Sequence, residues 1–121
     1  MRVFCEEQGV SREEELDGLD DESLHLIAAD ESGVIATCRL RFTADGCKLE
    51  RMAVEARMRG RGAGARLLER AEEDARERGA RTMVLHAQRS AEPFYAAHGY
   101  ETEGEPFTEA EIEHVRMTKA L

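Results

Sequence analysis

The sequence predicts an α/β (α+β) fold, a mixed and mostly antiparallel sheet flanked by helices, and three patterns point to it. Residues 34–42 alternate between two faces, which is typical of a strand with one buried side. The predicted buried face carries Val34, Ala36, Cys38, Leu40 and Phe42, and the other face carries Ile35, Thr37, Arg39 and Arg41. Apolar residues recur at helical spacing from residue 63 to residue 75. A group of strands followed by the order strand–helix–strand–helix predicts a sheet with helices packed on it.

The first half of the chain is predicted to be an antiparallel meander. Its strands are predicted over residues 24–29, 34–42 and 48–54, joined by turns at residues 30–33 and 45–46. Ahead of the meander, residues 2–9 are predicted to be the end of a helix that stops at Gly9. The acidic segment that follows, to about Ser23, is predicted to be a loop or a short helical turn.

The second half is predicted to alternate strands and helices. A helix that begins after a glycine-rich turn should end at Gly79, which can take the left-handed conformation of a C-terminal cap. The remaining elements are predicted as a strand over residues 81–87, a short helix from an N-cap at Ser90 to His98, and strands over residues 100–102 and 112–118. The connection between the last two strands is expected to include Pro106 and Glu109.

Length and composition predict a single domain over residues 1–121. A chain of 121 residues is long enough for one core, and 41 % hydrophobic with 36 % charged residues is typical of a globular protein. No apolar run approaches the roughly 20 residues of a membrane span. The N-terminus lacks a secretory signal, so we expect a cytoplasmic protein without a membrane partner. The net charge of −9 argues against nucleic acid as a partner.

The cysteines and histidines do not predict a metal site. Cys5, Cys38 and Cys47 form no CxxC pair, and none has a histidine nearby at metal-ligand spacing. We therefore expect reduced thiols and no bound metal.

The turn Arg59-Gly60-Arg61-Gly62-Ala63-Gly64 is the motif with the clearest chemistry. It follows a predicted strand and opens a predicted helix, whose first N–H groups have no partner within the helix. Glycines let the backbone approach a ligand closely, and the helix dipole and arginines favour an anion. The turn therefore predicts a phosphate-binding site.

Three phosphate-binding patterns compete for this turn. A P-loop requires a lysine that is absent here. A dinucleotide fingerprint fits by letter at Gly60, Gly62 and Ala65, but no acidic residue follows in residues 83–87, where the next strand is predicted. The third pattern is led by Arg59 and continues with Gly62 and Gly64.

Two motifs in order resemble the GNAT family of N-acetyltransferases. Residues 50–54 and 59–64 are similar to the coenzyme A signature of that family, which follows a strand and opens a helix. Residues 84–87 and 91–100 are similar to its second signature. The resemblance covers roughly residues 24–120 and implies a GNAT fold. It implies an enzyme that moves an acetyl group from acetyl-CoA to a primary amine by direct attack in a ternary complex. A non-catalytic acyl-CoA-binding or regulatory module with the same fold is the alternative.

Three segments are further similar to a bacterial subgroup, the ElaA-like acetyltransferases: residues 3–9, 17–25 and 107–117. One departure from the family is that Met1 lies inside what should be the first helix, so the N-terminal strand is expected to be missing. A sheet edge left unpaired in this way is a site for association, and a homodimer is a further expectation.

The resemblance also implies roles for individual residues. Tyr95 matches the position of a proton donor to the departing thiolate. The acceptor amine must lose a proton, and Glu50, then His86, then His114 are the candidate bases. The residues expected to bind the coenzyme A pyrophosphate and pantetheine are Met52, Ala53, Val54, Arg59, Gly60, Arg61, Gly62, Ala63, Gly64 and Ala65. The acceptor is expected to be a small-molecule or peptide amine that the sequence does not identify.

Overall fold

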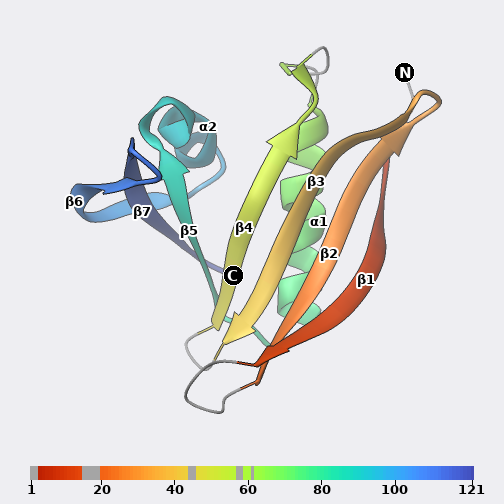
Figure 1. Ribbon diagram of the computed structural model, residues 1–121, viewed down its shortest axis with the longest axis horizontal. Helices are drawn as coiled ribbons and strands as arrows, with labels where there is room; N and C mark the ends of the chain where they lie inside the picture. Colours follow the sequence, from red (N-terminus) through yellow and green to blue (C-terminus); the bar gives the residue numbers. More distant parts are fainter. Residues whose placement is uncertain (1–2, 15–19, 44–45, 57–58, 61) are drawn as a thin grey trace.

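The chain forms one seven-stranded sheet, and the computed structural model describes residues 3–14, 20–43, 46–56, 59–60 and 62–121 of it (Figure 1). The strand order is β1-β2-β3-β4-β5-β7-β6, and only the β4–β5 pair is parallel. The predicted mixed, mostly antiparallel sheet with helices is confirmed. The elements are β1 Phe4–Glu14, β2 Asp20–Asp30, β3 Gly33–Thr43, β4 Gly46–Val54, α1 Ala63–Glu77, β5 Thr82–Gln88, the 3₁₀ helix η2 Arg89–Ala91, α2 Glu92–Ala97, β6 Glu101–Glu109 and β7 Ile112–Ala120.

The N-terminal segment is a strand, so the predicted helix over residues 2–9 is wrong. Strand β1 pairs antiparallel with β2 from Phe4 opposite Ala29 to Glu14 opposite Asp20. The loop predicted up to Ser23 is also wrong for residues 10–14 and 20–23, while residues 15–19 lie outside the described part of the chain. Pairing with a neighbouring strand outweighs a weak local helix preference, because alternate residues of β1 exchange hydrogen bonds with β2 along the whole ladder. The edge of β2 that we expected to be unpaired is therefore covered by β1.

The strands of the meander lie where they were predicted, and the pairing of β2 with β3 contains one irregularity. Ala28 lies opposite Ala36 and Ala29 lies opposite Val34, so Ile35 is an extra residue in β3. This bulge turns Ile35 toward the core, where it is 1 % exposed, although the alternation had predicted it on the polar face.

Helix α1 packs on the core as its periodicity predicted, and it lies along β2, β3 and β4 in Figure 1. Five apolar side chains of α1 are fully buried, and Gly79 follows the helix with φ of 87°; the five are Ala63, Leu67, Leu68, Ala71 and Ala75. Two further contacts tie α1 to the other end of the sheet. The buried carboxylate of Glu72 accepts hydrogen bonds from Tyr100 Oη at 2.8 Å and from Lys119 Nζ at 3.0 Å. A buried carboxylate requires such partners, so this network fixes β7 against the helix.

The strands predicted in the second half of the chain are confirmed, and two predicted details are wrong. The N-cap of α2 is Ala91, and the predicted cap Ser90 lies in η2. Pro93 at the start of α2 provides a backbone angle suited to a first helical turn. Pro106 and Glu109 belong to β6 rather than to the connection, because strand pairing with β7 continues to the pair Glu109–Ile112.

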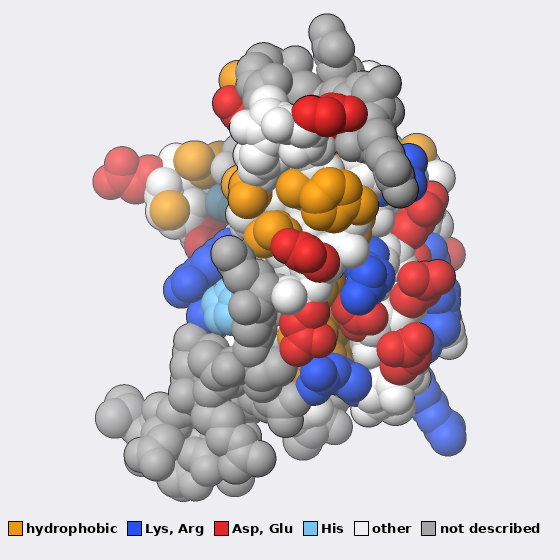
Figure 2. All heavy atoms as spheres, turned by 90° about the vertical axis from the view of Figure 1, so that its right-hand side faces the viewer, with side chains coloured by type: hydrophobic (Ala, Val, Ile, Leu, Met, Phe, Trp, Pro, Cys, Tyr) orange, Lys and Arg blue, Asp and Glu red, His pale blue; other side chains and the backbone are white. Residues whose placement is uncertain are grey.

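Charged side chains of both signs cover the face of the molecule shown in Figure 2. Acidic and basic groups lie next to one another there, and a group of hydrophobic side chains is exposed among them. The large hydrophobic residues that are exposed in the described part of the chain are Phe4, Val34 and Ile112. The expected homodimer stays a prediction.

The turn between β6 and β7 is strained. Ala110 and Glu111 have φ values of 51° and 65°, in the left-handed region that residues with a side chain rarely adopt. A two-residue hairpin turn of this kind favours Asn-Gly, because both central residues need a positive φ.

We predict that Glu111→Gly stabilises the protein. Glycine removes the steric cost at φ of 65°, so the free energy of unfolding should rise by roughly 0.5–1 kcal/mol. Chemical denaturation followed by circular dichroism measures the change. Thr108→Gly, on the exposed face of β6, is the matched control and should destabilise the hairpin. If Glu111→Gly also lost stability, the assignment of backbone strain to this turn would be wrong.

Candidate functional site

Strands β4 and β5 pair over only three residue positions and then separate. The pairs are Cys47–Met83, Lys48–Val84 and Leu49–Leu85, whereas β4 continues to Val54 and β5 to Gln88. Figure 1 shows the two strands diverging toward those ends. A cleft with a volume of about 1110 Å³ opens where they part, lined by β4, the start of α1, β5, α2 and the β6–β7 hairpin.

A bulge in β4 lies at the start of the divergence. Arg39 and Thr37 of β3 lie opposite Glu50 and Ala53, so three steps along β4 match two along β3. Arg51 within this bulge has φ of 55°. A bulge redirects the strand and the side chains that follow it, and such features are common beside functional sites.

Most of the predicted site residues meet in this cleft. Ala63 is the exception, because its side chain is fully buried in the core, and Arg61 lies outside the described residues. The predicted residues that line the cleft are Glu50, Met52, Ala53, Val54, Arg59, Gly60, Gly62, Gly64, Ala65, His86 and Tyr95.

The glycine-rich turn presents the uncapped start of α1 to the cleft. Gly60 and Gly62 have φ values of 79° and 85°, a conformation that glycine adopts without steric cost. Gly62 is the N-cap of α1, no side chain caps the helix, and its first turn has no acidic residue. The N–H groups of that turn can therefore donate to an anion. At Gly64 a Cβ atom would lie 3.3 Å from Val54 Cγ2, so glycine there allows β4 to pack closely on the helix.

Tyr95 is a largely buried phenol that borders the cleft. Its ring is 7 % exposed and packs edge-on against Phe94 and Tyr100. Burial raises the pKa of Tyr95 to about 12, so the phenol keeps its proton at neutral pH. The hydroxyl of Tyr100 donates to Glu72, whereas the structure gives the Tyr95 hydroxyl no hydrogen bond within the described residues. Tyr95 can therefore offer its proton to a ligand in the cleft.

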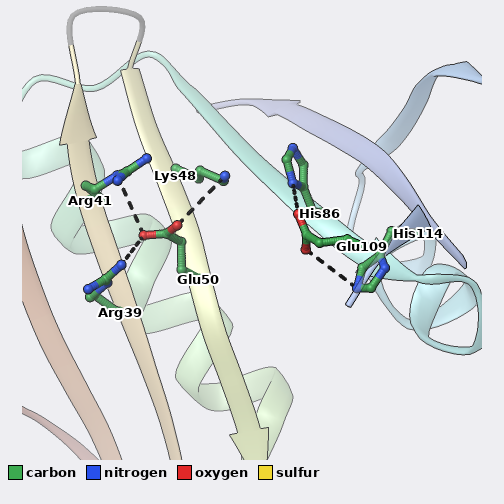
Figure 3. Close-up of polar contacts among 7 residues, drawn as sticks. All are labelled: Arg39, Arg41, Lys48, Glu50, His86, Glu109 and His114. Carbon is green, nitrogen blue, oxygen red and sulfur yellow. Dashed lines mark hydrogen bonds and ion pairs between the residues drawn. The ribbon is translucent and has the colours of Figure 1, made fainter. Parts of the chain in front are cut away.

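Glu50 lies among three cations (Figure 3). Arg39 donates to its Oε1 at 2.8 Å, and the charged atoms of Arg41 and Lys48 lie at 3.7 Å and 3.8 Å. Burial raises the pKa of Glu50, but the Arg39 hydrogen bond and the charges of Arg41, Arg39 and Lys48 outweigh it and lower the pKa overall. A carboxylate held in this way is ionised at neutral pH and is a weak base.

Two histidines flank one carboxylate on the other side of the cleft (Figure 3). His86 Nδ1 lies 3.2 Å from Glu109 Oε1, and His114 Nε2 lies 3.8 Å from Glu109 Oε2. Glu109 lies in the segment similar to the ElaA-like subgroup, but no role was predicted for it, because His86 and Glu109 are 23 residues apart and meet only in the folded sheet. Within the described residues, no group of three potential ligands has the geometry of a metal site.

The cysteine thiols do not line the cleft. Cys5, Cys38 and Cys47 are all free, and none of them is among the cleft-lining residues of the described chain. Burial raises the pKa of both Cys38 and Cys47 to about 12, which keeps these thiols protonated and unreactive.

No helix in the described part of the chain has the length and apolar content to cross a membrane.

Known proteins share both the sequence and the fold of this chain. A family model described as an acetyltransferase (GNAT) domain matches residues 2–121. The Bacillus subtilis protein YjcF, described as an uncharacterized N-acetyltransferase, is 38 % identical over 118 residues, which are 97 % of this chain and 84 % of YjcF.

Two solved structures extend the comparison. An acyl-CoA N-acyltransferase from Pseudomonas aeruginosa matches with a TM-score of 0.72 at 26 % identity, covering 82 % of this chain and 69 % of that one. Escherichia coli ElaA matches with a TM-score of 0.73 at 21 % identity, covering 87 % of this chain and 73 % of that one. The second likeness shows the fold alone, so the ElaA-like subgroup stays a prediction.

We predict that Glu50→Gln destabilises the protein in a pH-dependent way. The folded pKa of Glu50 is lowered from 4.5, so its stabilisation is present above that pH and is lost as the pH falls through the folded pKa. The variant should lose about 2 kcal/mol at pH 7 and progressively less below pH 4. Denaturation curves across this range measure the difference.

Glu69→Gln on the exposed face of α1 serves as the control and should change stability little at any pH. A loss in Glu50→Gln that stays constant down to pH 2 would contradict the assigned ion pairs.

Proposed function

Because this chain belongs to the GNAT family of acetyltransferases, we propose that it moves an acetyl group from acetyl-CoA to a primary amine by direct attack in a ternary complex. One observation carries the proposal: the start of α1, Tyr95 and His86 all line the same cleft. An anion-binding helix start, a proton donor and a proton acceptor are the parts that transfer from a thioester to an amine requires.

One sheet and one core cluster support a single domain over residues 1–121.

The start of α1 would hold the pyrophosphate of the donor. The proposal rests on the N–H groups of Gly62, Gly64 and Ala65, which belong to an uncapped helix start that lines the cleft. Arg59 supplies positive charge at the same rim, with its Nε 3.4 Å from the carbonyl oxygen of Val54. Ala63 completes the proposed cradle with its backbone N–H, and the predicted role of Arg61 falls outside the described residues.

Strand β4 would bind the pantetheine arm through its main chain. Beyond Leu49, β4 has lost its pairing with β5, so Met52, Ala53 and Val54 border the cleft with one edge of the strand exposed. An extended ligand can add to such an edge by main-chain hydrogen bonds. A backbone N–H of this segment would also stabilise the oxyanion that forms when the amine attacks the thioester.

Tyr95 would protonate the departing thiolate. Its phenol holds a proton at neutral pH, lies at the cleft and has no competing hydrogen bond from the described residues. As the tetrahedral intermediate collapses, the carbon–sulfur bond breaks and the thiolate takes the Tyr95 proton. Direct attack, rather than an acetylated cysteine, is supported by two observations: no cysteine is among the cleft-lining residues of the described chain, and burial raises the pKa of all three thiols, so they stay protonated.

The base that accepts the amine proton is assigned to His86 rather than Glu50. Both line the cleft, but three cations around Glu50 lower its basicity. We assign Glu50 to keeping Arg39, Arg41 and Lys48 in place beside the acceptor. His86 lines the cleft, and imidazole is the side chain that most often serves as a general base in enzymes.

We predict that the protein releases free thiol from acetyl-CoA when a panel of primary amines is supplied. Tyr95→Phe should lower kcat about 10- to 100-fold, because the thiolate loses its acid, while calorimetry should show unchanged CoA affinity. Tyr100→Phe is the matched control, since the Tyr100 hydroxyl donates to Glu72 in the core. Failure to bind CoA, or binding of NAD or ATP in its place, would overturn the proposed function.

We predict that Gly62→Ala weakens CoA binding. Alanine at φ of 85° strains the N-cap and turns the first N–H groups of α1 away from the pyrophosphate, so CoA affinity should fall about tenfold. Gly79→Ala provides a close control at the other end of the same helix, because Gly79 has φ of 87° and an added Cβ meets nothing within 4 Å at either position.

Calorimetry with CoA and thermal melting compare the two variants. Equal losses of stability, with weaker CoA binding only in Gly62→Ala, are expected. Equal CoA affinity in both variants would contradict the proposal that the start of α1 binds the pyrophosphate.

A further inference from the structure

A carboxylate bridges two histidines at the cleft, and the three residues come from three different strands. His86 lies on β5, Glu109 ends β6 and His114 lies near the start of β7. All three line the cleft beside β4 (Figure 3). Residues brought together from distant segments beside a ligand cleft are candidates for chemistry rather than for local folding.

The hydrogen-bond partners fix the tautomer of each ring. His114 Nδ1 lies 2.8 Å from the carbonyl oxygen of Ile112, which only accepts, so Nδ1 carries the hydrogen and the neutral ring has a bare Nε2. His86 Nδ1 faces Glu109 Oε1 at 3.2 Å and therefore also carries its hydrogen. The His86 Nε2 atom is then left as a proton acceptor.

The same carboxylate faces both rings. When His86 takes a proton at Nε2, the imidazolium remains bonded to Glu109 through Nδ1. His114 Nε2 and Glu109 Oε2 are 3.8 Å apart, and while the ring is neutral both atoms are acceptors and form no hydrogen bond. A protonated ring and the carboxylate attract each other at this separation. His114 is 7 % exposed, whereas the Glu109 side chain is 52 % exposed, so water reaches the carboxylate.

Local packing holds the three groups in this arrangement. The ring of Phe107 stacks on His114 at 6.1 Å and packs edge-on against His86 at 5.0 Å. Glu109 is followed immediately by the strained turn at Ala110 and Glu111, both with positive φ. Backbone strain that persists beside a cleft is consistent with a functional constraint on what the turn presents, here the Glu109 carboxylate.

We propose that Glu109 is a positioning residue that holds His86 as the base of acetyl transfer and couples it to His114. The proposal rests on the proposed function. In the step, the amine nitrogen bonds to the thioester carbon, its proton passes to His86 Nε2, and the carbon–sulfur bond breaks with the Tyr95 proton moving to the thiolate. The Glu109 carboxylate keeps its charge throughout and orients the ring, as a carboxylate does beside a catalytic histidine.

Other charged groups lie near His86, Glu109 and His114 and also contribute to the electrostatic potential at these three residues. Glu50 and Lys48 lie on β4 across the cleft. Arg116 of β7 lies opposite His86 in the β5–β7 ladder. None of these groups changes in a Glu109 variant, so a shift in the pH profile reports on the Glu109 contact itself.

We predict that Glu109→Gln lowers kcat about 10- to 100-fold and leaves the KM for acetyl-CoA unchanged. Loss of the negative charge disfavours the imidazolium, so the acidic limb of the kcat/KM profile should move to lower pH. Glu109→Asp, which keeps the charge, should restore part of the rate. Glu105→Gln, an exposed carboxylate of β6, is the matched control and should behave as wild type. Assays with EDTA exclude a contribution from a contaminating metal.

Wild-type turnover combined with an unchanged pH profile in Glu109→Gln would overturn the role of Glu109 alone. Absence of turnover with every amine would instead overturn the proposed function and the role of Glu109 with it.

Discussion

The short parallel ladder between β4 and β5 is the constraint on which the rest of the structure depends. Three residue pairs join the two halves of the sheet, and beyond Leu49 the strands part. Because a strand edge without a partner has main-chain groups to offer, the divergence creates both the space and the binding surface of the cleft. A longer ladder would close the cleft and bury the start of α1 against β5.

A junction of three pairs needs support from outside the sheet, and α1 provides it. The helix packs on β2, β3 and β4 and reaches β7 through the contacts of Glu72 with Tyr100 and Lys119. Among the described residues, Arg51 has a positive φ and lines the cleft, and the pair Ala110–Glu111 with positive φ directly follows the lining residue Glu109. Backbone strain in the described residues therefore lies at or next to residues that line the cleft.

The sequence predicted most of the fold because its patterns are local. Helix α1 follows from apolar spacing and from Gly79, and β3 follows from alternation, so each can be read within about a dozen residues. The first strand was missed because its stability comes from pairing with β2, which no local pattern reveals. Ile35 was placed on the wrong face because the bulge is set by the register with β2.

The same division holds for the site. The sequence by itself determined the glycine-rich helix start, the position of Tyr95 and the family to which they belong, because each depends on a contiguous motif. Only the tertiary structure decided the charge environment of Glu50 and the meeting of His86, Glu109 and His114. The physical reason is that the protonation and orientation of a side chain depend on its neighbours in space. The strand order brings β5 beside β7, and no local sequence pattern specifies that order.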